Sequence, residues 1–349
     1  MRRQYQQLIL TFVGLFMVDL VLAEAEILGP APVTTSGQFQ NLGGDLEQVS
    51  VTVRIPFLLR RFTTHFRSGD GAPRLSEVQP DLAAIKAAQD DARVTWIGHA
   101  TLLAQFPGLN VLTDPIWSAT PSPVPALGPK RFVAPGVALD DLPDIDVVVI
   151  SHNHYDHMDL PTLKALAAIN PRTLFLVPLG NAEVLLDAGI ERVRALDWGQ
   201  TVELNHYKIV ALPTQHWSKR SLLDTNRSLW SSWAVIGESK RFYFAGDTGY
   251  FKGFKAIGER YGPFDLVAVP IGAYAPRAMM RATHMNPEEA MLAAVDLKAK
   301  HALAIHYGTF DLSDEPLAEP PSRFKQAASV NGYDPSKAWI LDIGGQRKF

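Results

Sequence analysis

Cysteine is missing from this chain of 349 residues. Its absence excludes disulfide bonds and a cysteine nucleophile, so catalysis must rely on other side chains. A charge excess is missing too, because 33 lysines and arginines are balanced by 36 aspartates and glutamates. With neither a strong positive field nor a platform of basic and aromatic residues, we do not expect nucleic acid as a partner.

The sequence also has no apolar run that spans a bilayer comfortably. The longest candidate, residues 8–22, follows Met1-Arg2-Arg3 and precedes Ala23-Glu24-Ala25. A basic start, a short apolar stretch and a small-residue exit predict a secretory signal peptide in residues 1–25. The run falls short of the ~20 residues of a membrane span, and Asp19 interrupts it. We therefore expect an exported or membrane-associated protein, with an uncleaved anchor and a cytoplasmic start as alternatives.

Histidine is scarce, with ten in the chain, yet His152, His154 and His157 stand within six residues together with Asp156. The segment follows the apolar residues 146–151, which read as a buried strand too short for a helix. Neutral imidazole and carboxylate are ligands of zinc and similar metals. The pattern predicts a metal site at a strand end, with ligands suited to two closely spaced ions. The alternative is a polar loop with scattered histidines.

Three further candidate ligands follow apolar runs rich in strand-forming residues. They are His216, Asp247 and His306, after residues 207–212, 241–245 and 302–305. Singly, each has an ordinary reading, as a surface histidine or a turn aspartate. Four strand ends that each finish in a candidate ligand indicate one sheet edge lined with metal-binding groups.

Two more polar residues follow strand-like runs that point to the same edge. His99 follows residues 94–97 and Asp114 follows residues 111–113. We expect both to orient metal ligands through hydrogen bonds. Alternatively, His99 is a buried histidine that only makes hydrogen bonds within the core.

The chain resembles the metallo-β-lactamase superfamily and, within it, the family of N-acylphosphatidylethanolamine-hydrolysing phospholipases D. The resemblance runs from Arg93 to the C-terminus. The motifs that carry it are residues 95–101, 113–115, 128–132, 151–157, 215–217, 244–250, 270–274, 287–290 and 305–310.

The resemblance implies an α/β fold of the αββα sandwich type, with the metal site at one edge of two sheets. It also implies two zinc ions per chain. One is held by His152, His154 and His216, the other by Asp156, His157 and His306, and Asp247 bridges them. Relatives with a di-iron redox centre usually carry glutamate where this chain has His154, which argues against a redox role. Iron or manganese loading stays open.

The resemblance also marks His284, a family histidine near the metals, as a candidate for substrate contact or proton donation. It stands just before a strong helix start, formed by the cap Asn286, Pro287 at the first helical position and the capping-box residue Glu289. Alternatively, His284 has only a structural role beside that helix cap. Asp156, Asp247 and His284 are the expected catalytic residues.

Residues 93–349 are expected to form the hydrolase domain, and residues 26–92 an N-terminal extension on or near its core. Within the extension, residues 51–62 mix apolar residues with arginines. Such a stretch suits the surface of a membrane, with Phe57 and Leu58 toward lipid, or simply a cover for the core. The sequence does not determine the oligomeric state.

The implied activity is a zinc-dependent phosphodiesterase of phospholipase D type. It would hydrolyse N-acylphosphatidylethanolamine, or a related glycerophospholipid, to phosphatidate and an N-acylethanolamine. Two metal ions lower the pKa of a shared water toward neutrality, and the resulting bridging hydroxide is the expected nucleophile. The alternatives are a metal-dependent lactonase or carboxylic-ester hydrolase, and a non-catalytic metal- or lipid-binding protein.

Overall fold

The structure is a computed structural model that describes residues 28–46, 49–65, 75–87, 89–124, 126 and 128–349. The expected signal peptide or anchor in residues 1–25 lies outside the described residues and stays a prediction. Among the residues that are described, no helix is both long and apolar enough to cross a membrane.

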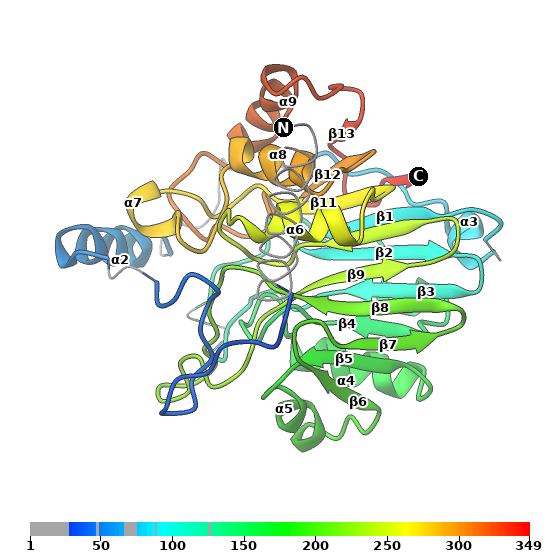
Figure 1. The fold of residues 1–349 in the computed structure, drawn as a ribbon, viewed down its shortest axis with the longest axis horizontal. Helices are drawn as coiled ribbons and strands as arrows, with labels where there is room; N and C mark the ends of the chain where they lie inside the picture. Colours follow the sequence, from blue (N-terminus) through cyan, green and yellow to red (C-terminus); the bar gives the residue numbers. More distant parts are fainter. Residues whose placement is uncertain (1–27, 47–48, 66–74, 88, 125, 127) are drawn as a thin grey trace, which may run out of the picture.

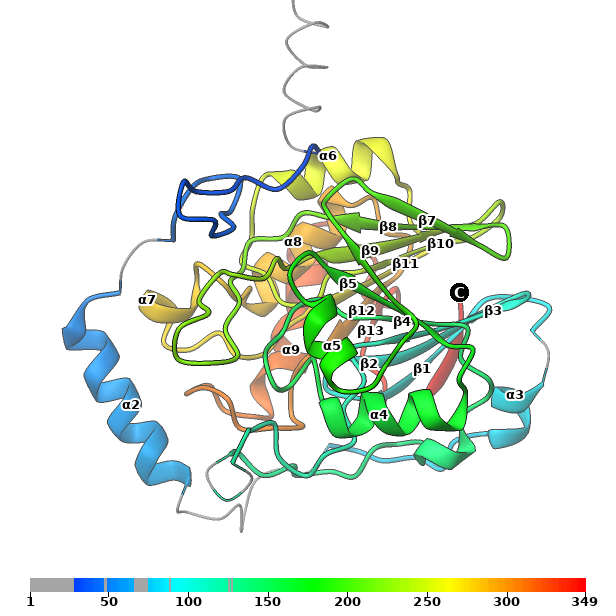
Figure 2. The same ribbon diagram turned by 90° about the horizontal axis from the view of Figure 1, so that it is seen from below.

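The first sheet gathers most of the N-terminal half of the domain at the lower level of Figure 2. Its strands, in spatial order, are β14 (Gln346–Lys348), β1 (Arg93–Gly98), β2 (Thr101–Phe106), β3 (Leu109–Thr113), β4 (Val147–Val149), β5 (Leu174–Pro178) and β6 (Val193–Leu196). The pairs from β14 to β3 are antiparallel, and those from β3 to β6 are parallel. The carboxyl ends of β3, β4 and β5 therefore meet at one edge.

The second sheet repeats this pattern of pairs. Its strands, in spatial order, are β7 (Thr201–Leu204), β8 (Tyr207–Leu212), β9 (Ser232–Ile236), β10 (Arg241–Phe244), β11 (Leu266–Pro270), β12 (Ala302–Ile305) and β13 (Ala338–Trp339). The pairs from β7 to β10 are antiparallel, and those from β10 to β13 are parallel. Figure 1 shows the strands of both sheets stacked in this order.

Helices cover both outer faces, which confirms the predicted αββα sandwich. The helices in chain order are α2 (Val51–His65), α3 (Leu82–Lys86), the 3₁₀ turn η2 (Leu139–Asp141), α4 (Leu160–Ile169), α5 (Ala182–Asp187), α6 (Gly253–Arg260), α7 (Arg277–Met280), α8 (Pro287–Asp296) and α9 (Glu319–Val330). The helix predicted to start at Pro287 is present as α8. The start of α8 has the predicted capping box between Asn286 and Glu289.

Alternation along the strands divides the core into two layers. Val147 and Val149 of β4 belong to the cluster between the sheets, whereas Val148 belongs to the cluster beneath α4. Full burial of each such side chain contributes about 1.5–3 kcal/mol to folding. The two layers hold the strand ends rigidly, and this is the edge where the candidate ligands lie.

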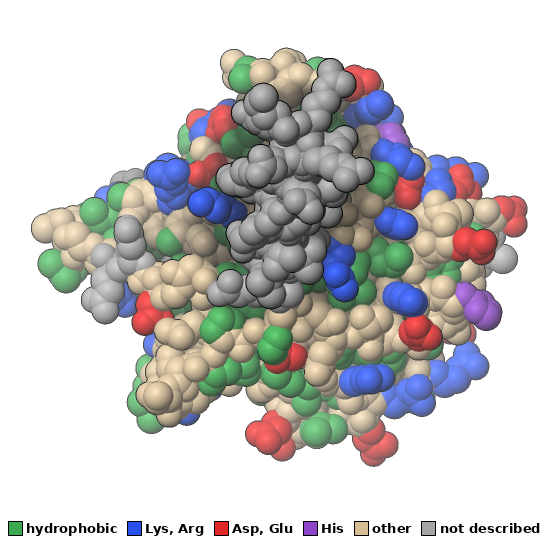
Figure 3. Space-filling model, in the orientation of Figure 1, with side chains coloured by type: hydrophobic (Ala, Val, Ile, Leu, Met, Phe, Trp, Pro, Cys, Tyr) green, Lys and Arg blue, Asp and Glu red, His purple; other side chains and the backbone are tan. Residues whose placement is uncertain are grey.

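The extension contains a helix that the sequence reading does not specify. Helix α2 projects from the body at the left of Figure 1, and hydrophobic side chains are visible on it in Figure 3. Phe57 is buried, while the large apolar side chains that stay exposed are Val51, Ile55, Leu58 and Leu59. The expectation that Phe57 faces lipid is therefore wrong, because its side chain is buried. Arg60 and Arg61 hold α2 on the protein through ion pairs with Asp314 and Asp311.

Candidate metal centre

The candidate ligands come together at the ends of β4, β8, β10 and β12. His306 directly follows β12, and the two residues expected to orient ligands, Asp114 and His99, directly follow β3 and β1. These three residues have positive φ angles of 59°, 34° and 53°, respectively. Positive φ is uncommon outside glycine and concentrates at functional sites, where the surrounding fold maintains the strained turn. Here it turns the chain abruptly from the strand into the edge of the sandwich.

The first group of imidazoles is His152, His154 and His216. Nε2 of His152 lies 2.7 Å from Nδ1 of His154, and Nε2 of His216 lies 3.4 Å from the same atom. His152 and His216 are fully buried. The structure therefore brings together all three residues predicted to hold one ion.

The second group is Asp156, His157 and His306, joined by His99. Nε2 of His157 and Nε2 of His306 lie 3.3 and 3.4 Å from Oδ2 of Asp156. The two imidazole nitrogens are 3.2 Å apart. All three residues predicted for the second ion are thus in mutual contact.

Asp247 lies between the two groups. Its carboxylate is 3.2 Å from Nε2 of His157 and 3.1 Å from Nε2 of His306, and 4.0 Å from Nε2 of His216. The preceding Gly246 is required at this point, because a Cβ there would come within 2.4 Å of the Ser151 side chain. This position is the one that the predicted bridging role needs.

The spacing of these atoms fits divalent metal ions. Tetrahedral zinc with bonds of ~2.0–2.1 Å separates its ligand atoms by about 3.3 Å. The contacts of 3.1 to 3.4 Å match that value, while the 2.7 Å pair of His152 and His154 would open by about 0.6 Å. Buried imidazole nitrogens facing one another without an acceptor between them need a cation or a proton. The donor set suits zinc, and it does not exclude iron or manganese.

Burial sets the protonation of the first group. It lowers the pKa of His152 and His216 well below the ordinary value and that of His154 to about 4. These rings are therefore neutral at pH 7, which is the form that binds metal.

In the second group, the pKa values of the histidines are raised instead of lowered. Burial also disfavours imidazolium there, but the carboxylates of Asp247 and Asp156 outweigh it. They raise the pKa of His157 well above its usual range and that of His306 to about 9. In the metal-free protein, protons on these two rings supply the positive charge that metal ions would otherwise bring.

Asp114 supports the ligand loop, as predicted for a residue that orients ligands. Its Oδ2 accepts a hydrogen bond from Nδ1 of His157 at 2.6 Å, and both its oxygens accept from Ser151. Burial raises the pKa of this carboxyl group, and these donors oppose the shift. By holding Nδ1, Asp114 directs Nε2 of His157 toward the centre.

His99 and His284 both border the site. Nε2 of His99 lies 2.9 Å from Oδ2 of Asp156. Nδ1 of His284 lies 3.8 Å from Oδ2 of Asp247, with 14% of the His284 side chain exposed. His284 is therefore placed to meet a ligand that enters from solvent, although it also precedes the cap of α8.

Sequence reasoning missed Arg220, which braces the ligand loop from outside. Its guanidinium donates to the carbonyls of Asn153 and Met158 at 3.0 and 2.9 Å, and it stacks over Tyr155. No local pattern signals this role, because the guanidinium contacts residues that are more than 60 positions away in the chain.

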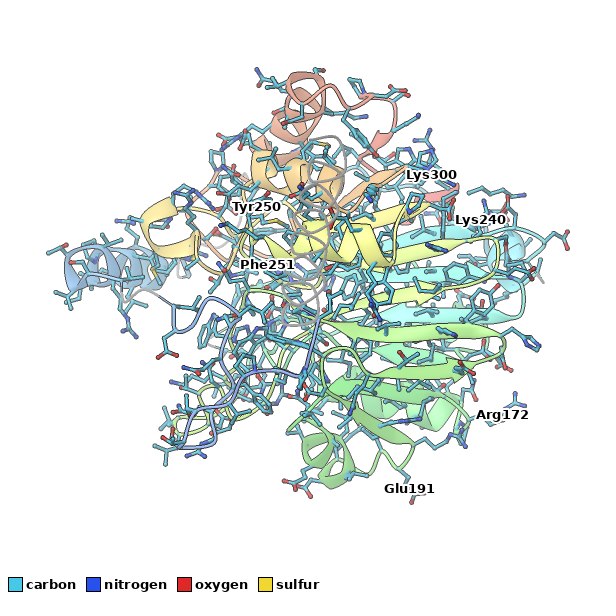
Figure 4. The ribbon with its side chains drawn as sticks, viewed as in Figure 1. Arg172, Glu191, Lys240, Tyr250, Phe251 and Lys300 are labelled. Atoms are coloured by element: carbon cyan, nitrogen blue, oxygen red, sulfur yellow. The ribbon has the colours of Figure 1, made fainter. Side chains whose placement is uncertain are left out.

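The segment after Asp247 is also anchored. Tyr250, labelled in Figure 4, donates to Asp296 at the end of α8 at 2.6 Å. The ring of Phe251 packs against Phe254 of α6 at 4.6 Å between centroids. Beside Tyr250, a cavity of about 590 Å³ extends toward the first turn of α2, and none of the seven candidate ligands lines it.

Comparison with known proteins agrees with this arrangement. Residues 109–307 match the family model described as a beta-lactamase superfamily domain. The chain is 43% identical to N-acyl-phosphatidylethanolamine-hydrolyzing phospholipase D 1 of Caenorhabditis elegans, over 66% of this chain and 68% of that protein. It is 37% identical to the mitochondrial N-acyl-phosphatidylethanolamine-hydrolyzing phospholipase D of Saccharomyces cerevisiae, over 68% of this chain but only about half (52%) of that protein.

Solved structures show the same fold. A metallo hydrolase of the archaeon Ignicoccus hospitalis has a TM-score of 0.57 and 23% identity, and the match covers 74% of this chain and 98% of that one. The protein is a metal-dependent hydrolase that belongs to the metallo-β-lactamase superfamily and, within it, to the family of the N-acylphosphatidylethanolamine-hydrolysing phospholipases D.

Proposed function

We propose that the protein is a zinc-dependent phosphodiesterase that cleaves N-acylphosphatidylethanolamine, or a related glycerophospholipid, to phosphatidate and an N-acylethanolamine. The names of the worm and yeast relatives support the substrate class. The observation that carries the proposal is the pair of buried ligand groups that meet at Asp247. Such a pair suits in-line displacement at a phosphodiester, where both the attacking and the leaving oxygen need charge stabilisation.

The protein residues have separate tasks in this reaction. Two zinc ions, when bound, supply Lewis acidity toward phosphoryl oxygens and lower the pKa of water. The ligands of both groups hold these charges within a buried edge of the sandwich, where electrostatic stabilisation is stronger than in water. Asp114 keeps His157 directed at the centre, and Asp247 brings the two groups into one site.

His284 is assigned to substrate contact. Burial lowers its pKa, so its ring is neutral at pH 7. A neutral imidazole is a poor general acid, but its N–H is a good hydrogen-bond donor to a phosphate oxygen. This argument favours binding of the phosphodiester over donation of a proton to the leaving group.

We further propose that the protein binds its lipid substrate at a membrane surface and that α2 lies on that surface. Val51, Ile55 and Leu58 recur at helical spacing and are between 52% and 66% exposed. Arg54 on the same helix is exposed and suits lipid phosphates. A short amphipathic helix of this kind binds in the interface without crossing the bilayer.

The first experiment is mass spectrometry of lipids after incubation with the zinc-loaded protein. The substrates are N-acylphosphatidylethanolamine, ordinary phosphatidylethanolamine and several lactones, each with and without chelator. We expect chelator-sensitive release of phosphatidate and N-acylethanolamine. Opened lactones beside intact phospholipids would instead establish an ester hydrolase on the same scaffold, and no turnover of any substrate would support a binding protein.

A further inference from the structure

The N-terminal segment before α2 lies along the loops that follow β8. The backbone N–H of Phe39 donates to Asn226 at 2.8 Å, and the side chain of Gln38 donates to the carbonyl of Thr225 at 3.1 Å. Arg227 in turn donates to Ser36 at 2.9 Å. This segment precedes residue 109, where the match to the superfamily domain begins.

One side chain of the segment, Asn41, reaches the metal centre and is 4% exposed. Its Oδ1 accepts the backbone N–H of His216 at 2.9 Å, and its Nδ2 donates to the backbone carbonyl of His216, also at 2.9 Å. The same Oδ1 accepts from Nε1 of the buried Trp230 at 3.1 Å. The carboxamide therefore pairs with His216 as the edge of a neighbouring strand would.

His216 needs such a partner because it stands beyond the end of β8. The strand stops at Leu212, so the sheet no longer pairs the backbone of His216. A buried N–H and a buried carbonyl without hydrogen-bond partners destabilise the folded state. Asn41 removes that destabilisation and fixes the position of the peptide groups on both sides of the ligand.

The ring of His216 has a second anchor. Its Nδ1 donates to the carbonyl of Thr283 at 3.0 Å, which leaves Nε2 free to bind metal. The Thr283 carbonyl sets the rotation of the ring, whereas Asn41 sets the backbone that carries it. Together these contacts surround the residue whose Nε2 lies 3.4 Å from Nδ1 of His154.

We propose that Asn41 is a positioning residue of the metal centre, so that the N-terminal segment forms part of the site formed by His152, His154 and His216. The proposal depends on His216 being a ligand, and not on the identity of the lipid substrate. Failure of the lipid experiment would therefore leave it intact.

Metal titration of the full chain tests this role directly. Metal-free wild type, Asn41→Ala and Asn41→Asp are titrated with Co²⁺ and followed by visible absorption, and Zn²⁺ affinity is measured by competition with a chromophoric chelator. Asn41→Asp keeps the volume and the acceptor but sets an oxygen against the His216 carbonyl. Gln38→Ala is the matched control, since it removes a carboxamide of the same segment that touches no ligand.

We expect both Asn41 variants to bind one of two ions about 10- to 100-fold more weakly, the usual loss when a partner of a ligand is removed. The Co²⁺ spectrum of that site changes, while the other site and Gln38→Ala keep wild-type behaviour. Asn41→Asp gives the same information if Asn41→Ala does not fold. Wild-type affinity and spectrum in the variants, with only a lower melting temperature, would overturn the proposal and leave Asn41 a packing residue.

Discussion

Asp247 contacts both ligand groups. Replacing Asp247 with Asn keeps the shape but removes the charge that holds two cations together. We expect one bound metal ion to be lost and turnover to fall about 10²- to 10³-fold, with the fold preserved. Metal content by mass spectrometry and a far-UV circular dichroism spectrum check this. Two retained ions with normal turnover would contradict the bridging role.

Replacing His284 with Ala tests whether this residue contacts the substrate without binding metal. A hydrogen bond to a charged group contributes about 1.5–3 kcal/mol, so His284→Ala should lower kcat/KM about 10- to 100-fold. Both metal ions should remain, because neither of the two predicted ligand groups includes this ring. His301→Ala is the control, because His301 lies just before β12 and packs on Trp339 of β13. Unchanged kinetics in His284→Ala would mean that His284 has only a structural role beside the cap of α8.

At the scale of elements, α2 has four exposed large apolar side chains, Val51, Ile55, Leu58 and Leu59, and we propose that it contacts the membrane surface. Replacing Leu58 and Leu59 with Asp charges the outer face and leaves the buried Phe57 in place. We expect binding to phospholipid vesicles to fall about tenfold or more, since burial of each leucine contributes about 1.5–3 kcal/mol. Metal content should not change.

Sedimentation with vesicles measures this binding. Leu186→Asp on α5 is the matched control, because its side chain is 50% exposed compared with 52% for Leu58. Equal vesicle binding by the wild type and the α2 variant would remove α2 from the proposed membrane contact.

The strand ends could be predicted because each apolar run is followed within four residues by a candidate metal ligand. A second local signal, the spacing of Asn286, Pro287 and Glu289, predicted the capping box of α8. Helix α2 was not predicted, since Pro56 lies inside it and arginines break the apolar pattern. Asn41 and Arg220 were missed for another reason: they contact backbone groups 175 and 67 residues away, and no short pattern encodes such a contact.

At the scale of the whole molecule, metal and proton compete for the second ligand group. His306 has a pKa of about 9 in the metal-free protein, compared with 6.5 ordinarily. A raised pKa stabilises the folded state fully below pH 6.5, and this contribution is lost as pH rises toward 9. The metal-loaded protein has already exchanged these protons for metal.

We therefore expect the melting temperature gained by adding Zn²⁺ to increase between pH 6.5 and 9. His152, His154 and His216 do not oppose this trend, because their lowered pKa values keep them neutral throughout that range. Differential scanning calorimetry with zinc and with chelator measures both curves. A gain that stays constant or shrinks with rising pH would contradict the assigned protonation of His157 and His306.

The matching order of strand pairs makes the two halves of the chain depend on each other. Strands β1 to β6 and β8 to β13 follow one pattern of antiparallel and parallel neighbours, and β14 and β7 each lie at the edge of the sheet built by the other half of the chain. Each sheet is therefore completed by a strand from the other half, so neither half holds all the strands of its own sheet. Asp114 follows β3 and Asp247 follows β10, which occupy matching places in the two sheets, and one orients a ligand while the other lies between the two ligand groups.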